Sequence, residues 1–480
     1  MRKQHMVPVL AMAALFTMAH STAHATNGMN LEGYGARSHA MGGAAMGFDT
    51  GNSNMMNNPA AASLSKSNQR IGVGLRMLGP DVAAESTAAP AAANAGSDGD
   101  AYYMPSFSYM RKSGKFDYGL GVFAQGGMGT EYKAGSTLFA GGLSYNLTTA
   151  ATAATALSGL ENRSELSVGR AMLPLAYRVN DKLSVGGSVD LVWMGLDMKM
   201  DMDGNNFAQM MIGGNVTGSM VTTMQTNAAA MGAINYGRFD FSDGSDFTGE
   251  ADGLGAAFKL GFTYKVNNKL TVGGAYHSQT AMSDLEADNA TVSFNTSTMG
   301  TVPLSGKIKV KDFEWPQKVA LGGAYQVNDK FLLVGDVSWT DWSSTMEKFK
   351  LQFESDNSAT NQAFGFNNQE MNVVMDQNWD DMIVLHMGGE YKVTDVLALR
   401  AGFSISDNPI PNNTLNPLFP AVVPNHITGG FGYDFKNGGK LNASLAWAPE
   451  TDNVSTANAS GDMNVSHGQL SWAMNYSYDF

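Results

Sequence analysis

The 480-residue chain has no cysteine, and only 15% of its residues are charged, with 43 acidic against 30 basic side chains. Without cysteine there is no disulfide framework, and neither thiolate catalysis nor thiolate metal ligation is available. The formal net charge of −13 argues against nucleic acid as a partner, because phosphate binding depends on a basic patch. Beyond residue 25 there is also no apolar run near the ~18 residues that a membrane-spanning helix requires.

The N-terminal end is typical of a secretory signal peptide over residues 1–25. Arg2 and Lys3 form its basic start, residues 7–19 are mostly apolar, and Ala23-His24-Ala25 fits a cleavage site. An exported chain that lacks a membrane helix and holds 55 glycines can enter a membrane only as a closed β-barrel.

A repeated motif predicts β-hairpins along most of the chain. It reads Y-R-V-N-D-K-L-S-V-G-G from Tyr177, returns at Tyr264, Tyr325 and Tyr391, and has a looser copy at Tyr433. Each copy ends one alternating run, turns on Asn or Asp, and starts another. Because the intervals between copies are unequal, short turns lie at one end of the strands and long loops at the other, as in transmembrane β-barrels.

Alternation with a period of two supports long membrane-crossing strands. Apolar Val185, Val189 and Leu191 alternate with polar Ser188 and Asp190, and about ten such residues span a bilayer. Six short turns, with one strand before and one after them, predict an all-β transmembrane antiparallel barrel of about 14 strands over residues 69–480. An even count places both termini on the periplasmic side and the long loops outside the cell.

Residues 26–68 differ from the rest of the chain. They are rich in Gly, Ala, Asn and Met and show no strand alternation. A segment of this kind ahead of a barrel either hangs in the periplasm or folds into the lumen as a plug. The small residues favour a plug, because they pack closely inside a wall.

The longest loop, at about residues 200–250, is rich in methionine. We expect Phe207, Met210, Met211 and Met224 to form an apolar surface that captures a ligand; the alternative is an ordinary loop packed on itself. The nearby acidic residues Asp197, Asp201 and Asp203 lack the closing Glu of a calcium loop, so we expect a solvated acidic loop and no metal site.

Three stretches, in this order and spacing, resemble the FadL-type long-chain fatty-acid and hydrocarbon transporters of Gram-negative outer membranes. They are Gly33–Ala44 followed by Asn58-Pro59-Ala60, then Trp315–Gly322 through Asp341-Trp342-Ser343, and finally Trp379–Asp381 through Pro409-Ile410-Pro411. The aromatic C-terminal Phe480 also resembles the end of bacterial outer-membrane proteins, where the barrel assembly machinery binds. Together the similarity covers nearly the whole exported chain.

The resemblance implies how such a protein would work. A ligand is captured at an extracellular groove and passes to a lumen site. A hatch at Asn58, Pro59 and Ala60 then moves, and the ligand leaves sideways beside an inward kink in the third strand. Here that strand is residues 116–132. It carries Gly126, Gly127 and Gly129, and interior glycines often mark a bulge or bend; the alternative is that they allow close packing against the plug.

A fatty acid needs a cation for its carboxylate in an otherwise apolar lumen. Strand parity turns Arg400 and Lys318 inward, which makes them the candidates. The competing interpretation is that Arg400 pairs with Glu390 across its hairpin and only stabilises the wall.

The sequence therefore predicts a monomeric outer-membrane transporter that takes up hydrophobic compounds by passive diffusion, with long-chain fatty acids as the first expectation. Alkanes or monoaromatic hydrocarbons are alternatives within the same family. A lipid-acting enzyme and a structural or adhesive barrel are alternatives from other classes. No enzyme is expected, because no nucleophile, base and orienting group come together. Neither a cofactor nor a nucleic-acid partner is expected; lipid and lipopolysaccharide of the outer membrane are expected neighbours.

Overall fold

The computed structural model describes residues 28–480 except 246–247, 424 and 458–460. The predicted signal peptide lies outside the described residues. Within them, no helix has the length and apolar character needed to cross a membrane.

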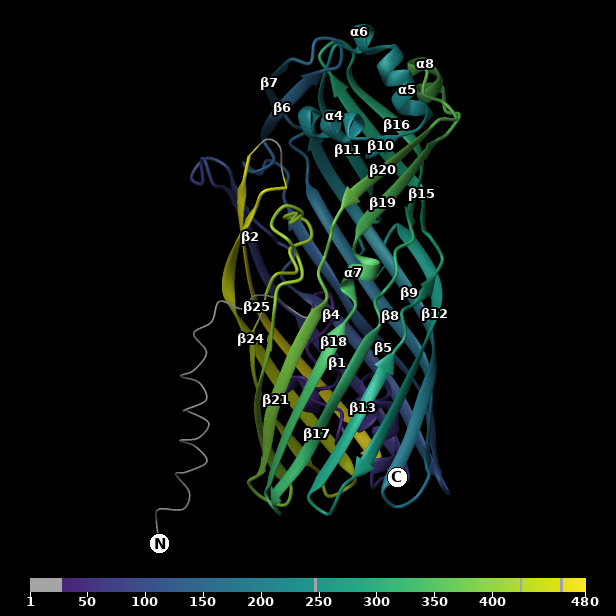
Figure 1. The fold of residues 1–480 in the computed structure, drawn as a ribbon, viewed down its shortest axis with the longest axis vertical. Coiled ribbons are helices and arrows are strands. Elements are labelled where there is room, and N and C mark those ends of the chain that lie inside the picture. The colour runs from purple at the N-terminus through teal and green to yellow at the C-terminus, as the bar shows by residue number, and fades with distance from the viewer. Residues whose placement is uncertain (1–27, 246–247, 424, 458–460) are drawn as a thin grey trace.

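Antiparallel strands close into a tall barrel (Figure 1). Each strand of the ring pairs with the next, and the last pairs with the first, with Val73 opposite Tyr476. Closure means that the ring has no first or last strand at an open edge. In order, the ring consists of β1 (Gln69–Leu78), β4 (Tyr102–Ser113), β5 (Phe116–Tyr132), β8 (Asn162–Arg178), β9 (Leu183–Asp203), β12 (Ala251–Lys265), β13 (Leu270–His277), β17 (Lys318–Asn328), β18 (Phe331–Thr340), β21 (Met382–Lys392), β22 (Leu397–Ser406), β23 (His426–Asp434), β24 (Gly439–Ser455) and β25 (Met463–Asp479).

The sheet as a whole contains 25 strands, so the expected count of about 14 is too low for it. The difference arises because connections that were expected to be loops are themselves strands and extend the wall beyond the ring. These are β2 (Pro80–Ser86), β3 (Asn94–Gly96), β6 (Gly141–Asn146), β7 (Thr152–Ala156), β10 (Val216–Thr217), β11 (Ala233–Phe241), β14 (Ala281–Met282), β15 (Leu285–Thr296), β16 (Gly300–Lys311), β19 (Lys348–Ser355) and β20 (Glu370–Asp376). Helices α4 (Gly204–Ile212), α5 (Ser219–Thr226), α6 (Ala228–Met231), α7 (Trp342–Thr345) and α8 (Ala359–Phe364) lie among them (Figure 1).

The two faces of the wall have the polarity that the alternation predicted. On β9, Val189 and Leu191 are 67% and 54% exposed, whereas Ser188 and Asp190 between and beside them are buried. An apolar outer surface and a polar inner one suit a barrel surrounded by lipid. The prediction of an all-β, closed antiparallel barrel is confirmed.

Residues 28–68, called the inner segment below, lie within the ring of strands (Figure 1). They form short turns of helix at α2 (Ala36–His39), η1 (Gly51–Ser53), α3 (Asn54–Asn57) and η2 (Pro59–Leu64). The wall satisfies backbone groups that these short helices leave unpaired. Asp336 accepts from the backbone N–H of Ala45 and Met46 at 2.5 and 3.0 Å, and Thr428 accepts from that of Gly42 at 2.9 Å. These bonds hold the segment against β18 and β23 of the wall.

Glycines of the wall allow this close contact. A Cβ added at Gly402 would lie 2.4 Å from the backbone nitrogen of Gly42, and one at Gly273 would lie 2.0 Å from the carbonyl oxygen of Met46. Gly186 approaches Ala60 in the same way. These three wall glycines come from three copies of the repeated motif. The glycines of the motif are therefore part of the strands and also leave room for the inner segment; they are called seats below.

The seat at Gly402 leads to a testable prediction. We expect Gly402→Ala to displace the inner segment, because its methyl group would overlap backbone that cannot move independently. Small polar solutes should then leak through the barrel, measured as raised conductance in planar bilayers. The matched control is Gly429→Ala on the neighbouring strand, where an added Cβ meets its nearest atom at an ordinary 3.7 Å. Equal conductance of the two variants would contradict the proposal that Gly402 leaves room for the inner segment.

Candidate functional site

The third strand of the ring, β5, carries a β-bulge. Ala124 pairs with Gly169 and Gly126 with Val168, so Gln125 is an extra residue without a partner in the ladder. A bulge bends its strand and disrupts pairing. The bulge lies in the strand, and at the glycines, where the sequence led us to expect a bend.

A gap in the wall accompanies this bulge. The pairing of β4 with β5 ends at Phe107 and Val122, although β4 continues to Tyr102 and β5 to Tyr132. A cavity of about 40 Å³ lies there, lined from both strands and from the inner segment, and it includes Tyr34. A space of this size holds little more than water, so the gap is closed in this conformation.

The start of the inner segment lies directly behind the bulge. The backbone N–H of Gly127 donates to the carbonyl oxygen of Met29 at 3.1 Å, and Asn30 forms an isolated β-bridge with Gly126. A Cβ at Gly126 would lie 2.1 Å from that same carbonyl oxygen, and one at Gly129 would lie 2.3 Å from the hydroxyl of Tyr102. Gly126 therefore allows close packing against the inner segment, which is the alternative that the sequence left open, whereas Gly129 makes room for Tyr102 of the wall strand β4.

A buried network of charges anchors the bulge. The guanidinium of Arg170 donates to the side-chain oxygen of Gln125 and, at 3.0 Å, to Asp190. Asp190 also accepts from Lys259 at 2.5 Å and from Ser188 at 2.6 Å. All five side chains are at most 6% exposed. Two cations thus share one carboxylate within the wall, and removing that carboxylate would leave both without compensation.

The inner segment is tied to the same bulge. The hydroxyl of Tyr34 donates to the backbone carbonyl of Gln125 at 2.7 Å. The Asn-Pro-Ala turn lies farther along: Asn58 donates to the carbonyl oxygens of Met46 and Phe262, both at 3.0 Å, and accepts from the backbone of Ala60. With Pro59 at the first helical position, this triplet makes a rigid bend docked on β12.

Of the two predicted lumen cations, Arg400 is fully engaged by the protein. Its guanidinium donates to Glu390 at 2.7 Å and to Asn442 at 2.8 Å, and Arg37 of the inner segment donates to the other oxygen of Glu390 at 2.9 Å. This is the hairpin pair that the sequence offered as the competing interpretation, with a third member that the sequence did not predict.

Lys318 has a different environment. Among the described residues it makes no ion pair within 4 Å, and it lines a cavity of about 30 Å³ together with His277, Asp336 and His386. Its side chain therefore faces a small polar cavity beside the inner segment, and its ammonium group has no ion-pair partner among the residues that the structure describes.

Three tryptophans pack edge to face in the interior above the inner segment. The ring centroids of Trp315 and Trp342 are 5.6 Å apart, and those of Trp342 and Trp379 are 5.3 Å apart. Trp315 donates to the side chain of Asn30 at 2.9 Å. The indole N–H groups of Trp342 and Trp379 are buried and have no acceptor among the described residues. Unpaired buried donors are rare in proteins and mark a place where a ligand or water can bind.

A groove of about 730 Å³ opens at the end of the barrel opposite the short turns, between α4, β20 and the connections around them, and Met210 lines it. The other residues expected to form the capture surface lie beneath: Phe207 and Met224 are 0% exposed and Met211 is 7% exposed. They are packed inside the cap that α4 and α5 form over this end of the barrel, because both helices turn their apolar faces inward, so the expectation that they are exposed is wrong.

The acidic residues of this region have protein partners. Asp201 pairs with Arg238 at 2.9 Å, Asp203 caps α4 by accepting from Asn206, and Asp197 accepts from the backbone of Glu250. Among the described residues, no group of acidic or histidine side chains is arranged to hold a metal ion.

The sequence missed several of these residues. Gln125 and Arg170 carry no local signal, because only the folded wall brings them together. The tryptophans lie within stretches singled out for their resemblance, but nothing in the sequence shows that Trp315, Trp342 and Trp379 meet.

The family model described as "Outer membrane protein transport protein (OMPP1/FadL/TodX)" matches residues 11–480. The toluene transporter TodX of Pseudomonas putida is 28% identical, with a TM-score of 0.78, over 94% of this chain and 99% of that one. The toluene transporter TbuX of Ralstonia pickettii is 27% identical, with a TM-score of 0.73, at the same coverage. A putative outer membrane protein of Neisseria meningitidis serogroup B is 29% identical over 166 residues, 33% of this chain. The chain spans 36% and 34% of the lengths of the two curated relatives it matches.

The charge network predicts that the loss of Asp190 destabilises the protein more than the loss of Arg170. We expect Asp190→Asn to lower the free energy of unfolding by about 3–5 kcal/mol, because it leaves Arg170 and Lys259 buried without a counter-charge. Arg170→Met should cost less, since Lys259 and Asp190 remain as a neutral pair. Urea unfolding of the two variants in detergent checks the order. The idea fails if Arg170→Met proves the more damaging change.

Proposed function

This chain belongs to the outer-membrane transport-protein family described as OMPP1/FadL/TodX, and we propose that it carries hydrophobic compounds inward across the outer membrane by passive diffusion. The observation that carries the proposal is the gap between β4 and β5, which lies beside a bulge and directly in front of the inner segment. If the inner segment moves and the gap widens, an apolar molecule gains a way from the lumen into lipid.

The proposed route begins at the extracellular groove. A ligand enters where Met210 lines the groove, while Phe207, Met211 and Met224 support the groove from beneath as part of the buried cap. It then passes the three tryptophans, reaches the bulge at Gly126, and leaves sideways. An apolar ligand on this route never crosses the aqueous periplasm, where its solvation would be unfavourable.

In this proposal the inner segment is the hatch. Met29 and Asn30 occupy the inner side of the bulge, so they must move before a ligand can reach the gap. The bend at Asn58, Pro59 and Ala60 stays docked on the wall and keeps the rest of the hatch closed. Axial leakage of polar solutes is thereby prevented while the first residues move.

For the substrate we favour monoaromatic hydrocarbons over long-chain fatty acids, which reverses the order expected from sequence. Arg400 already binds Glu390 and Asn442, so one of the two carboxylate candidates is occupied. Edge-to-face packing of Trp315, Trp342 and Trp379 extends readily to one more ring, and an indole N–H can donate to the face of an aromatic ligand. The solved relatives TodX and TbuX, at 28% and 27% identity, are toluene transporters.

Fatty acids remain the second candidate because of Lys318. Its ammonium faces a small cavity without an ion-pair partner among the described residues, and a carboxylate would supply one. Further expectations are a monomeric state, contact with lipopolysaccharide around the barrel, and recognition of Phe480 by the barrel assembly machinery.

Lateral release can be tested with a reversible lock, since the chain has no cysteine of its own. A disulfide between the cysteines introduced by Ser106→Cys and Phe123→Cys would extend the β4–β5 ladder by one pair and close the gap. Hydrocarbon uptake by cells should fall at least several-fold on oxidation and recover on reduction, while binding at the cell surface is unchanged.

The matched control is Phe107→Cys with Val122→Cys, the last pair of the existing ladder. Its disulfide leaves the gap as it is, so uptake should not respond to oxidation. Undiminished uptake by the oxidised variant that carries Ser106→Cys and Phe123→Cys would refute lateral release and favour axial passage past the hatch.

A pair of substitutions distinguishes monoaromatic hydrocarbons from fatty acids as the substrate. Trp342→Phe removes an N–H donor and part of the ring surface, and should weaken toluene binding about 2–10-fold. Lys318→Met keeps the length of the side chain without its charge, and should weaken oleate binding more than about tenfold while toluene binding is unchanged. Equilibrium binding to purified protein measures both. If Lys318→Met alters toluene and oleate equally, the lysine has only a structural role.

A further inference from the structure

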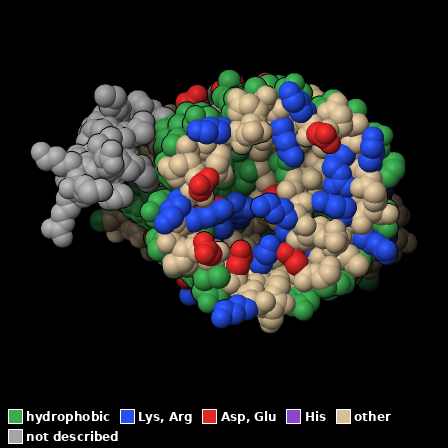
Figure 2. Space-filling model, turned by 90° about the horizontal axis from the view of Figure 1, so that it is seen from below, with side chains coloured by type: hydrophobic (Ala, Val, Ile, Leu, Met, Phe, Trp, Pro, Cys, Tyr) green, Lys and Arg blue, Asp and Glu red, His purple; other side chains and the backbone are tan. Residues whose placement is uncertain are grey.

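The barrel end that carries the tight turns has a cavity of about 570 Å³ between the inner segment and the wall. Figure 2 shows Lys and Arg side chains gathered around this hollow. Eight basic and four acidic side chains line it, although the whole chain has a formal net charge of −13. The charge of the molecule is therefore reversed at this one concave site, and a cleft lined by one sign of charge concentrates ions of the other.

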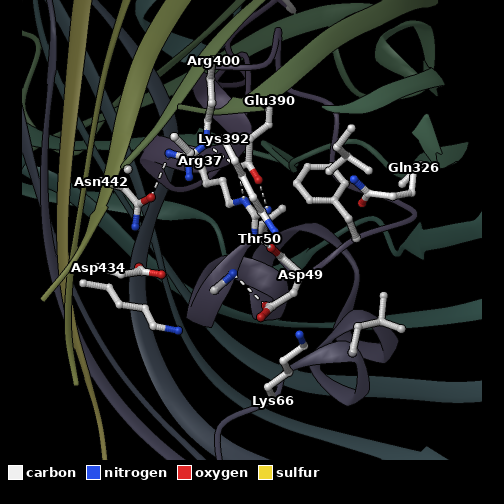
Figure 3. A pocket seen from close by; sticks show the side chains of 18 of the residues that line it. Arg37, Asp49, Thr50, Lys66, Gln326, Glu390, Lys392, Arg400, Asp434 and Asn442 are labelled. Atoms are coloured by element: carbon white, nitrogen blue, oxygen red, sulfur yellow. Dashed lines mark hydrogen bonds and ion pairs between the residues drawn. The ribbon is translucent and has the colours of Figure 1, made fainter. Parts of the chain in front are cut away.

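Half of the basic side chains are already paired. Arg37 and Arg400 share Glu390, and Figure 3 shows the three together at the inner end of the cavity. Burial opposes ionisation of Asp49, but Arg70 and Arg37 outweigh it and hold the pKa of Asp49 below its ordinary value. The remaining pair joins Lys440 to Asp479 at 2.9 Å.

The other four are Lys66, Lys269, Lys330 and Lys392. None makes an ion pair within 4 Å with a residue that the structure describes, and all four are exposed to solvent. They come from the end of the inner segment, two different turns and the end of β21, yet they line one cavity. Lys66 and Lys392 reach into the same space in Figure 3. Because all four line this cavity, their charges act on the same space.

We propose that this cavity binds a small multivalent anion, a polycarboxylate or a polyphosphate, from the periplasmic side. Lysine ammonium groups act as flexible point charges rather than rigid forks, so the site selects for number of negative charges more than for shape. The cavity volume lies in the range of small-molecule sites. A bound anion would also lie beside Arg37, through which the inner segment is tied to Glu390.

Isothermal titration calorimetry on the full exported chain in nonionic detergent tests the site, with tripolyphosphate and citrate as separate probes at low salt. We expect saturable binding of one anion per chain, which weakens as salt is added. The quadruple variant Lys66→Gln, Lys269→Gln, Lys330→Gln and Lys392→Gln should bind about tenfold more weakly or worse. Comparing the probes shows whether carboxylate or phosphate is preferred.

The matched control removes four other lysines, Lys307, Lys309, Lys348 and Lys350. They lie on β16 and β19 and are paired with acidic residues, so the loss of charge is equal but the cavity is intact. This variant should bind the anion like the unmodified chain. Equal weakening in both quadruple variants, or no saturable binding at all, would overturn the proposal. Heat-modifiable gel mobility verifies folding, and the single variant Lys392→Gln replaces the quadruple one if that does not fold.

Discussion

The need to pair the backbone of the inner segment governs the whole structure. This segment has only short turns of helix, and the ends of such turns leave N–H and C=O groups without a partner in the turn itself. The wall supplies partners: Asp336 binds two successive N–H groups and Thr428 a third. The backbone of the segment also approaches the backbone of the wall closely, and glycines such as Gly273 and Gly402 leave the room. The inward polar residues and the wall glycines therefore serve the same purpose: together they let the wall contact the backbone of the inner segment and pair its polar groups.

The same constraint explains where charge is buried. An inner wall that must bind a polar segment can also hold Arg170, Lys259 and Asp190 away from lipid, because polar groups inside a barrel do not face hydrocarbon. The network joins β8, β9 and β12 to the bulged residue Gln125 of β5. In this way the shape of the bulge depends on electrostatic contacts three strands away.

The two ends of the barrel differ in chemistry. Toward the end that carries α4 and α5 the interior is apolar, with the tryptophans and the packed cap under the groove. Toward the tight turns it becomes a basic cavity, where Lys66 and Lys392 face solvent. A hydrophobic ligand is therefore favoured in the upper half only, which agrees with an exit through the wall at mid-height rather than through the basic cavity.

The sequence alone determined the fold class, because the alternation of Val189 and Leu191 with Ser188 and Asp190 has a period of two and needs no tertiary information. Its glycines also pointed to the part of β5 where the bulge lies, and strand parity pointed to the pair of Arg400 with Glu390, since both depend on neighbours in one strand or hairpin. It could not determine that the extracellular connections are strands, that Phe207 and Met224 are buried, or that three tryptophans meet. Only the tertiary structure decides these, because burial and contact there depend on how segments distant in the chain close over the barrel. The charge network and the basic cavity have the same origin: each draws single residues from several strands, and no local pattern records that they converge.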